Sequence, residues 1–322
     1  MTYSSGGLIQ ATDYNTFATN TNAFWSTGTG NVGWGQTSVA SVSTSGVVTA
    51  TNWATLVNNL AAASNQTGQA ITTRTAPVTG NIVAILANVA TDITSLTTSS
   101  GNAAGTGTQY TAWTGTASKT TATGSGSTPW TITFTHTVTW ASADAARYFF
   151  NAGGLIKWET SKTADTTAAD TEWNDLANTL VGDIYITKGN GTQTIAAAAY
   201  TGTTKVGGTG TPTTLLTTTG YYGLITTDTT IYKQFADTSP YTGQFIQINA
   251  KTAGAGTQLV LTTTWVDPGG SVTGSSDNIS GGTATTGITF GTAPATVVTY
   301  FPPSVTYLSA AWGTPTVAAT VA

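Results

Sequence analysis

The one histidine of the chain is the first residue whose type could support chemistry. His136 stands between Phe134 and Val138 in a run whose alternate residues are apolar. A single histidine cannot build a multi-histidine metal site, and the absence of cysteine leaves carboxylates as the other ligands. The apolar neighbours favour a buried or interfacial histidine, with a catalytic base as the weaker alternative.

The acidic residues gather in one part of the chain and raise a second chemical possibility. The densest group is Glu159, Asp165, Asp170, Glu172, Asp175 and Asp183. Glycoside hydrolysis needs a pair of carboxylates. Glu172 and Asp175, however, lie one turn apart on the polar side of a predicted amphipathic helix, where solvated carboxylates are expected. We therefore predict that the chain is not an enzyme and that it holds no metal or other cofactor.

Aromatic side chains offer a third possibility, because exposed rings can bind sugars by stacking. The candidates are Trp113, Trp130, Tyr221, Tyr222, Tyr232 and Tyr241. Packing in a core or between subunits is the commoner use of such residues. A sugar-binding module is therefore an alternative function and not the favoured one.

Low charge restricts the classes of partner. Only 7% of the residues are charged and the net charge is −4, whereas an average soluble domain has about 25% charged residues. Nine scattered basic residues cannot form the patch that nucleic acid demands. No apolar run approaches the ~18 residues of a membrane span, and the N-terminal residues lack the basic and apolar regions of a signal peptide. We expect neither nucleic acid nor a membrane as a partner.

The elements that must position these residues fall into two parts and predict an α+β fold. Residues 1–105 indicate about three helices, which we interpret as an attachment or oligomerisation region. Residues 106–322 indicate a β-rich, Thr-rich domain with one main helix, over residues 163–183. The expected junction is the uncharged, glycine-rich stretch 99–109, where the pattern changes from helical to two-residue alternation.

The first two predicted helices have well-defined ends and faces. The first follows a cap at Thr12 or Asp13, and the second runs from a cap at Thr51 to Gly68. Their apolar faces are Tyr14, Phe17, Thr21 and Phe24 in the first helix and Trp53, Leu56, Val57, Leu60 and Ala61 in the second. Steps of three and four residues are typical of a helix with one buried side.

A third predicted helix follows a cap at Thr79 and carries a heptad pattern. Its apolar residues are Ile82, Leu86, Val89, Ile93 and Leu96, spaced by four, three, four and three positions. This spacing predicts a seam between copies of the chain, because coiled coils bury such positions. An amphipathic helix packed within its own chain is an equally weighted alternative, since two heptads are short for an independent coiled coil.

The stretch from 128 to 161 is expected to be the structural centre of the β-rich domain. Alternation places Ile132, Phe134, His136, Val138 and Trp140 on one face of a strand. Ser142 is the expected cap of a short helical turn. Gly153 and Gly154 are the expected hinge, with unusual backbone angles at both. We predict that three core anchors, Phe149, Phe150 and Trp158, tie this strand to the main helix.

Several blocks of the sequence resemble virion structural proteins of tailed bacteriophages. These proteins begin with an I-x-A-x-D-Y-N start that leads to W-x-T-G-x-G and a G-Y/W-G-Q loop, and they contain an A-R-Y-F-F-N-x-G-G block. The corresponding segments are IQATDYNTFATNTNAFWSTGTGNVGWGQ (9–36), VVTATNWATLVNNL (47–60), ARYFFNAGGLIKW (146–158), TEWNDLANTLVGDI (171–184) and YFPPSVTYLSAAWGTPTV (300–317). The blocks occur in the order found in that family and span most of the chain, which is richer in Thr and Ala and poorer in charge than we expect of the group.

The resemblance implies a structural component of the virion, assembled in the host cytoplasm. A tail, neck or baseplate appendage or a fibre protein is the expected role, with other virion proteins as partners. The heptad pattern adds the expectation of a homo-oligomer, a trimer or a larger ring. The alternatives are a receptor- or glycan-binding adhesin that contacts a host surface glycan, a capsid decoration protein and a polysaccharide depolymerase. The resemblance supplies no catalytic residues.

Overall fold

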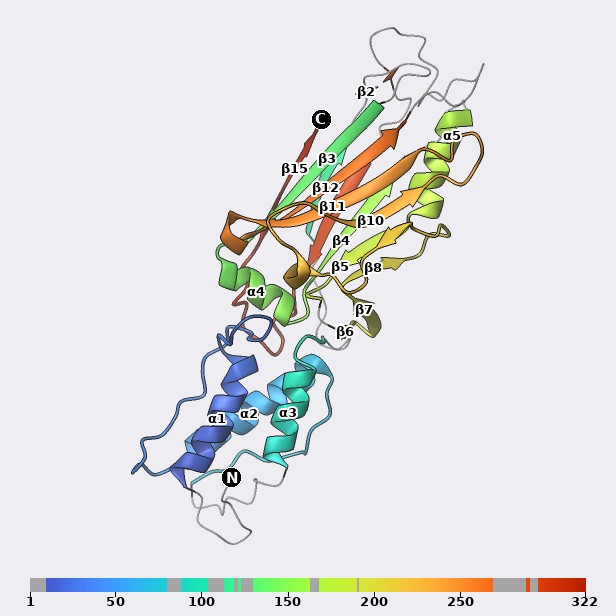
Figure 1. Ribbon diagram of the computed structural model, residues 1–322. Helices are drawn as coiled ribbons and strands as arrows, with labels where there is room; N and C mark the ends of the chain where they lie inside the picture. Colours follow the sequence, from blue (N-terminus) through green and yellow to red (C-terminus); the bar gives the residue numbers. More distant parts are fainter. Residues whose placement is uncertain are drawn as a thin grey trace.

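A computed structural model of the chain describes residues 10–79, 88–103, 113–118, 121–122, 130–162, 168–189, 191–268, 288–289 and 295–322. Three helices come first, and every described strand follows them. Figure 1 shows an elongated molecule with these helices at one end and antiparallel sheets at the other. The predicted α+β class is confirmed, while the predicted boundary between 105 and 106 lies outside the described residues.

Helices α1 (Ala11–Trp25) and α2 (Ala50–Thr67) bury nearly the faces that the sequence predicts. Tyr14, Phe17, Thr21 and Phe24 are all buried on α1. On α2, Ala63 replaces the predicted Ala61 on the buried side, and Ala61 is exposed. The rings of Tyr14 and Trp53 meet edge to face with centroids 5.2 Å apart, so the two helices share one aromatic contact.

The helix caps differ from the prediction. Thr49, and not Thr51, caps α2: its hydroxyl accepts a hydrogen bond from the Asn52 amide, and the Asn52 side chain accepts one from the Thr49 amide. This reciprocal pair satisfies two amides that a helix start leaves free. Helix α1 begins after Gln10 without a side-chain cap. Gly68 ends α2 in the left-handed conformation (φ 72°), as predicted.

Helix α3 (Val89–Thr98) does not form the predicted continuous heptad helix. Asn88 lies in the left-handed region (φ 63°) immediately before α3, so α3 begins at Val89 and is not continued from the residue before it. Val89, Ile93 and Leu96 are all buried in the chain's own core, which matches the intramolecular alternative. Ile82 and Leu86 lie outside the described residues.

Two antiparallel sheets face each other as a sandwich. The larger has the order β15 (Thr316–Val321), β3 (Trp130–Thr139), β12 (Gln258–Asp267), β11 (Phe245–Ala253), β10 (Thr229–Phe235) and β9 (Thr214–Leu215). The smaller has the order β1 (Trp113–Ser118), β14 (Ala295–Phe301), β4 (Leu155–Ser161), β5 (Asp183–Ile186) and β8 (Thr203–Val206). The Thr203 amide donates to the Leu216 carbonyl (3.2 Å), so one pair of sheet edges is joined.

Strand alternation fills the space between the sheets. Strand β3 buries Trp130, Ile132, Phe134, His136 and Val138 and turns its threonines outward, as the sequence predicts. Other large buried side chains include Tyr232, Ile246, Ile248, Leu259, Leu261 and Trp265 from the larger sheet and Ile156, Trp158, Ile184, Ile186, Val298 and Tyr300 from the smaller. One hydrophobic cluster runs from these residues into α1–α3, so the helices and the sandwich share a core.

Two further helical segments close the sandwich. Helix α4 (Ala143–Asn151) follows β3 and lies between the sheets and the N-terminal helices (Figure 1). Helix α5 (Ala168–Asp175) continues into a π-helical turn, η1 (Leu176–Leu180). Trp173, Leu176 and Leu180 are buried, and Gly182 ends the element (φ 71°). Residues 163–167 of the predicted helix 163–183 lie outside the described residues, and only the backbone of residues 168–170 is described.

The remaining elements are short. Strands β6 (Thr192–Ile195) and β7 (Ala198–Thr201) form a hairpin, and β2 (Thr121–Ala122) pairs with β13 (Ile288–Thr289). Two 3-10 turns, η2 (Tyr221–Gly223) and η3 (Gly254–Gly256), lie near α4 in Figure 1. Residues 39–49 form a connector without strand structure up to the start of α2.

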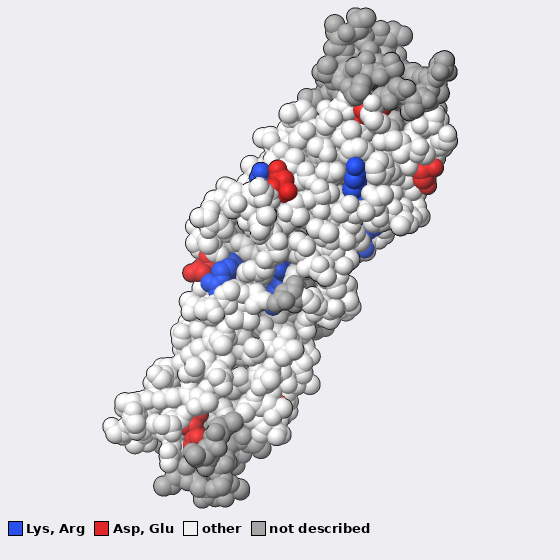
Figure 2. All heavy atoms as spheres, in the orientation of Figure 1, with Lys and Arg blue, Asp and Glu red and all other residues white. Residues whose placement is uncertain are grey.

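The described surface carries little charge. Figure 2 shows isolated blue and red side chains separated by wide uncharged areas on the face in view. Within the described ranges, none of the helices has the length and apolar character needed to span a bilayer.

Candidate functional site: a polar junction between helices and sandwich

A tight loop after α1, residues 26–36, forms the centre of the junction between the helices and the sandwich. The Gly35 amide donates to the Ser26 carbonyl (2.9 Å), and the Gln36 amide donates to the Trp25 carbonyl (3.0 Å). Gly33 has φ 102°, and a Cβ there would lie 2.2 Å from the Thr27 carbonyl oxygen. Only glycine fits such a position, which explains one of the glycines in GNVGWG.

Trp34 at the end of this loop is fully buried and joins three segments. Its indole nitrogen donates to the carbonyl of Ser100 (2.9 Å), just past α3, and to the carbonyl of Asn151 (3.0 Å), the last residue of α4. The final carbonyls of a helix have no partner within it. One indole nitrogen therefore donates hydrogen bonds at the C-terminal ends of two helices, and its ring packs on Phe24 (5.5 Å between centroids).

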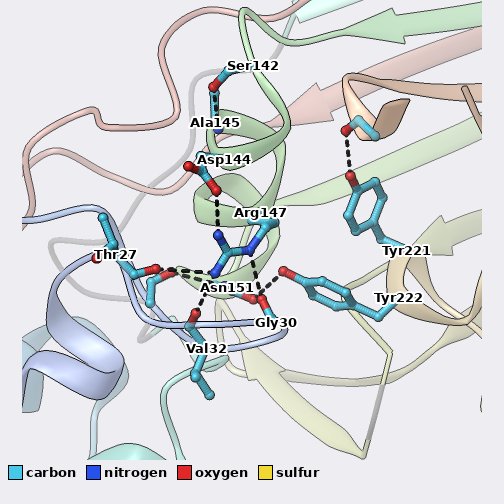
Figure 3. Close-up of polar contacts among 12 residues, drawn as sticks. Thr27, Gly30, Val32, Ser142, Asp144, Ala145, Arg147, Asn151, Tyr221 and Tyr222 are labelled. Atoms are coloured by element: carbon cyan, nitrogen blue, oxygen red, sulfur yellow. Dashed lines mark hydrogen bonds and ion pairs between the residues drawn. The ribbon is translucent and has the colours of Figure 1, made fainter. Parts of the chain in front are cut away.

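Arg147 on α4 binds the same loop from the other side. Its guanidinium donates to the carbonyls of Gly30 (3.0 Å), Thr27 (3.2 Å) and Val32 (3.3 Å), and it forms an ion pair with Asp144 (Figure 3). The planar fork of arginine can reach several carbonyls at once, which a lysine cannot. Arg147 thus fixes the path of the loop relative to α4.

Asn151 extends the network into the sandwich. Its side-chain amide donates to the Gly33 carbonyl (3.0 Å), and its side-chain carbonyl accepts a hydrogen bond from the Tyr222 hydroxyl (2.9 Å, Figure 3). Burial and the Tyr221 phenol beside it raise the pKa of Tyr222, so this hydroxyl keeps its proton.

The Gln36 side chain connects the loop to the C-terminal segment. It accepts a hydrogen bond from the Ser309 amide (2.8 Å) and donates one to the Ser309 carbonyl (3.0 Å).

A buried lysine completes the junction. Lys188 is 8% exposed, and its ammonium donates to the Asn31 carbonyl (3.4 Å). The backbone of Gly101 passes so close that a Cβ there would lie 2.8 Å from Lys188 Nζ and 2.5 Å from Gln193 Nε2. Burial lowers the pKa of Lys188 to about 8. Gln193 donates to the Gly101 carbonyl (2.6 Å).

This arrangement orders the backbone. Most of its side-chain donors bind backbone carbonyls, so the site can hold several segments of the chain in one geometry. Since the bonds connect residues up to 273 positions apart, the junction makes the helices and the sandwich one folded unit.

The predicted anchors lie beside this junction. Phe149, Phe150 and Trp158 are fully buried. The two phenylalanines pack on Trp140 (5.3 and 5.6 Å between centroids), and Phe150 stacks on Tyr221 (4.4 Å, 16° between ring planes). Trp173 of α5 packs on Trp130 of β3 (5.0 Å between centroids) and stacks on Trp265 of β12 (5.3 Å).

The two hinge glycines differ from each other. Gly153 has φ 94°, and a Cβ there would lie 2.8 Å from the Cβ of Ala103. Gly154 has no positive φ, so the prediction of an unusual angle at both positions is wrong for Gly154. Its constraint is space, because a Cβ would lie 2.7 Å from the Phe149 ring.

The histidine and most of the aromatic candidates are buried. His136 is fully buried between the sheets, as its apolar neighbours predict. Four of the six aromatic candidates for sugar stacking, Trp130, Tyr221, Tyr232 and Tyr241, are buried, and Tyr222 is held by Asn151. The side chain of Trp113 lies outside the described residues.

The prediction that Glu172 is solvated is wrong. Glu172 is 5% exposed, and its carboxylate accepts a long hydrogen bond from the Thr238 amide (3.5 Å). Burial raises its pKa. Carboxylate oxygens of Glu172, Asp175 and Asp237 lie within 4.8 Å of one another, and among the described residues no further ligand joins them.

Sequence reasoning missed Trp34, Arg147 and Asn151 as partners. The one available signal was that they belong to two of the blocks that carry the phage resemblance, 9–36 and 146–158. Comparison with protein-family models, with curated proteins and with solved structures finds no match to this chain.

Proposed function

We propose that the chain is a non-enzymatic structural component of a tailed-bacteriophage particle, as a tail, neck or baseplate appendage or a fibre protein. The observation that carries this proposal is the contact between the two most specific blocks of the resemblance. Trp34 and Gly33 from block 9–36 bind Asn151 from block 146–158, and Arg147 from the second block binds the loop of the first. These residue types therefore have a structural use, as expected for a motif that maintains a shape.

The surface supports the same proposal. Wide uncharged areas allow close approach of neighbouring subunits without the cost of removing charges from water (Figure 2). Other virion proteins are the proposed partners, and the virion is the proposed location. The helical end would attach the protein and the sandwich would project from it.

A homo-oligomer, a trimer or a larger ring, is part of the proposal. The heptad residues Val89, Ile93 and Leu96 do not support it, because they are buried within the chain. Its support is the uncharged surface alone. Light scattering of the purified chain in physiological salt is the test, and a stable monomer would reject self-association.

The experiment for the main proposal is detection of the chain in particles. Particles released by lysis of cells that carry the gene are purified on a density gradient and analysed by mass spectrometry and by antibody-labelled negative-stain imaging. We expect the chain in the particle fraction, with label at one defined position. A chain found only in the soluble fraction would reject the proposal.

The aromatic residues that suggested the glycan-binding alternative no longer support it, because most of them are buried. We propose no second function on the aromatic candidates or on the carboxylate pair Glu172 and Asp175.

A further inference from the structure

A strip of polar and aromatic side chains on the outer face of the smaller sheet and the neighbouring β6–β7 hairpin has no part in the junction. It consists of Lys157 and Glu159 on β4, Asp183 and Tyr185 on β5, and Tyr200 on β7. Lys157 is paired with Tyr185 across the two strands. Since Ile156 and Trp158 point into the core, the alternate residues of β4 point outward.

Contacts connect the five residues into one network, named here the tyrosine–carboxylate strip. Lys157 Nζ lies 2.7 Å from a Glu159 oxygen and 3.8 Å from an Asp183 oxygen. Burial and the nearby Asp183 carboxylate raise the pKa of the Tyr185 hydroxyl to about 12. The rings of Tyr185 and Tyr200 have centroids 5.2 Å apart and planes at 52°. The strip therefore combines ring faces, two acceptors and one donor.

The two rings rest on a separate small hydrophobic cluster. Tyr185 and Tyr200 pack against Leu155, Ile195 and Ala103, together with Phe301. Both tyrosines remain partly exposed. The cluster beneath fixes the rings in place, so a ligand would lose little side-chain entropy on binding them.

The concentration of charge in this strip is unusual for the chain. Only 7% of all residues are charged, yet three charged residues from two strands are in contact here. The side chains of Glu159 and Asp183 are 35% and 39% exposed. Exposed ion pairs contribute about 0–1 kcal/mol to stability, which makes stability a weak reason for the arrangement.

We propose that the tyrosine–carboxylate strip binds a neutral or amino sugar of a polysaccharide. Amphipathic tyrosine rings can stack against the C–H face of a sugar ring. Ionised carboxylates accept strong hydrogen bonds from hydroxyl or ammonium groups, and Lys157 donates to a ring or hydroxyl oxygen. Two carboxylates and one ammonium leave an excess negative charge, which disfavours acidic sugars, phosphates and nucleic acid.

This inference goes beyond the proposed structural function and does not depend on it. The strip lies on the sandwich, whereas the observation behind the structural function lies at the junction. The chain could be found in particles and bind no sugar, or bind a sugar and be absent from particles. The particle test and the glycan array therefore distinguish failure of one proposal from failure of the other.

The test is a glycan array probed with the full-length chain, carrying neutral, amino and acidic oligosaccharides, followed by calorimetric titration of the strongest signal. We expect binding to neutral or amino sugars. The double variant Tyr185→Ala/Tyr200→Ala should weaken it at least about tenfold, because each ring supplies stacking area. Glu159→Gln should weaken an amino sugar more than a neutral one.

A matched control lies on the other sheet. Phe235 and Phe245 form an outward ring pair with centroids 5.2 Å apart and planes at 55°, covered by Lys233. Phe245→Leu should leave sugar binding unchanged. Thermal melting checks that every variant is folded. Absence of any array signal, a preference for acidic sugars, or binding that persists in the folded double-tyrosine variant would each overturn the proposal.

Discussion

The indole nitrogen of Trp34 and the carbonyl oxygen of Asn151 lie 3.0 Å apart, although 117 positions separate the two residues. The same nitrogen is 2.9 Å from the Ser100 carbonyl. Trp34 thus binds the C-terminal ends of α3 and α4 at once. This contact explains how a loop after the first helix can fix the position of the helices against the sandwich.

Trp34→Phe should destabilise the protein by about 1–3 kcal/mol, because two buried carbonyls lose their donor while most of the ring packing remains. Urea denaturation followed by tryptophan fluorescence and circular dichroism measures the loss. The control is Trp265→Phe, since Trp265 is equally buried and its indole nitrogen has no hydrogen-bond partner among the described residues. Equal losses in the two variants would show that packing alone, and not the hydrogen bonds, accounts for the effect.

Arg147→Lys should release the loop 27–33 from α4 without unfolding the chain. Lysine keeps the charge but cannot reach the carbonyls of Gly30, Thr27 and Val32 together. The Arg147 side chain is 20% exposed, so solvent screening limits the loss of stability to about 1 kcal/mol. Hydrogen–deuterium exchange in the loop should be faster in the variant than in the wild type, and this increase should be larger in the loop than in β3. The idea fails if exchange in the loop equals that of the wild type.

Gly153→Ala should cost about 1–3 kcal/mol, since alanine is strained at φ 94° and its Cβ would meet Ala103 at 2.8 Å. Gly313 provides the control, because it also has a positive φ (63°) but nothing lies within 4 Å of a Cβ there. Gly313→Ala measures backbone strain alone. Thermal melting of both variants should therefore show a larger fall for Gly153→Ala, and equal falls would show that the contact with Ala103 is relieved.

Local patterns in the sequence predicted local structure well. The alternation from Ile132 to Val138 predicted the buried face of β3, and Ser142 caps α4 by accepting a hydrogen bond from the Ala145 amide (3.0 Å). Such features depend on neighbouring residues only. The predicted α+β class followed from the change of pattern along the chain, which two-residue and helical periodicities distinguish.

Features that depend on distant segments could not be predicted in this way. Glu172 was expected in water because its helix position is polar, but the loop that carries Thr238 packs over it. The heptad spacing is the same for a seam between chains and for a helix in a core. Burial of Val89 and Ile93 in the core depends on where α1 and α2 lie, and nothing in the spacing encodes that.

The partners of Trp34 and Arg147 were missed for the same reason. Backbone carbonyls carry no sequence signal, and both residues bind carbonyls. Single-sequence reasoning can identify a tryptophan in a glycine-rich loop as a feature of interest. It cannot identify the helix ends that the indole reaches.

Lys188 makes stability dependent on pH in a defined window. Burial lowers its pKa in the folded chain to about 8, whereas the ordinary value, taken for the unfolded chain, is 10.5. Between these values the unfolded chain binds the proton and the folded chain releases it, so stability rises as pH increases from about 8 towards 10.5. Below pH 8 both states are protonated, and the folded state bears the full cost of a buried charge, roughly 3 kcal/mol by linkage.

Lys188→Met should therefore be more stable than the wild type at pH 7.5 and should lose most of the rise between pH 8 and 9.5. Measurements stop at pH 9.5 because burial also raises the pKa of tyrosines such as Tyr221, and these destabilise the folded chain as unfolded tyrosines ionise near pH 10. Urea denaturation at each pH gives the free energy of unfolding. Lys251→Met, at an exposed ion pair with Asp228 (3.2 Å), is the control and should keep the wild-type slope. A wild-type free energy that is flat from pH 7.5 to 9.5 would show that the Lys188 ammonium is well solvated at the junction.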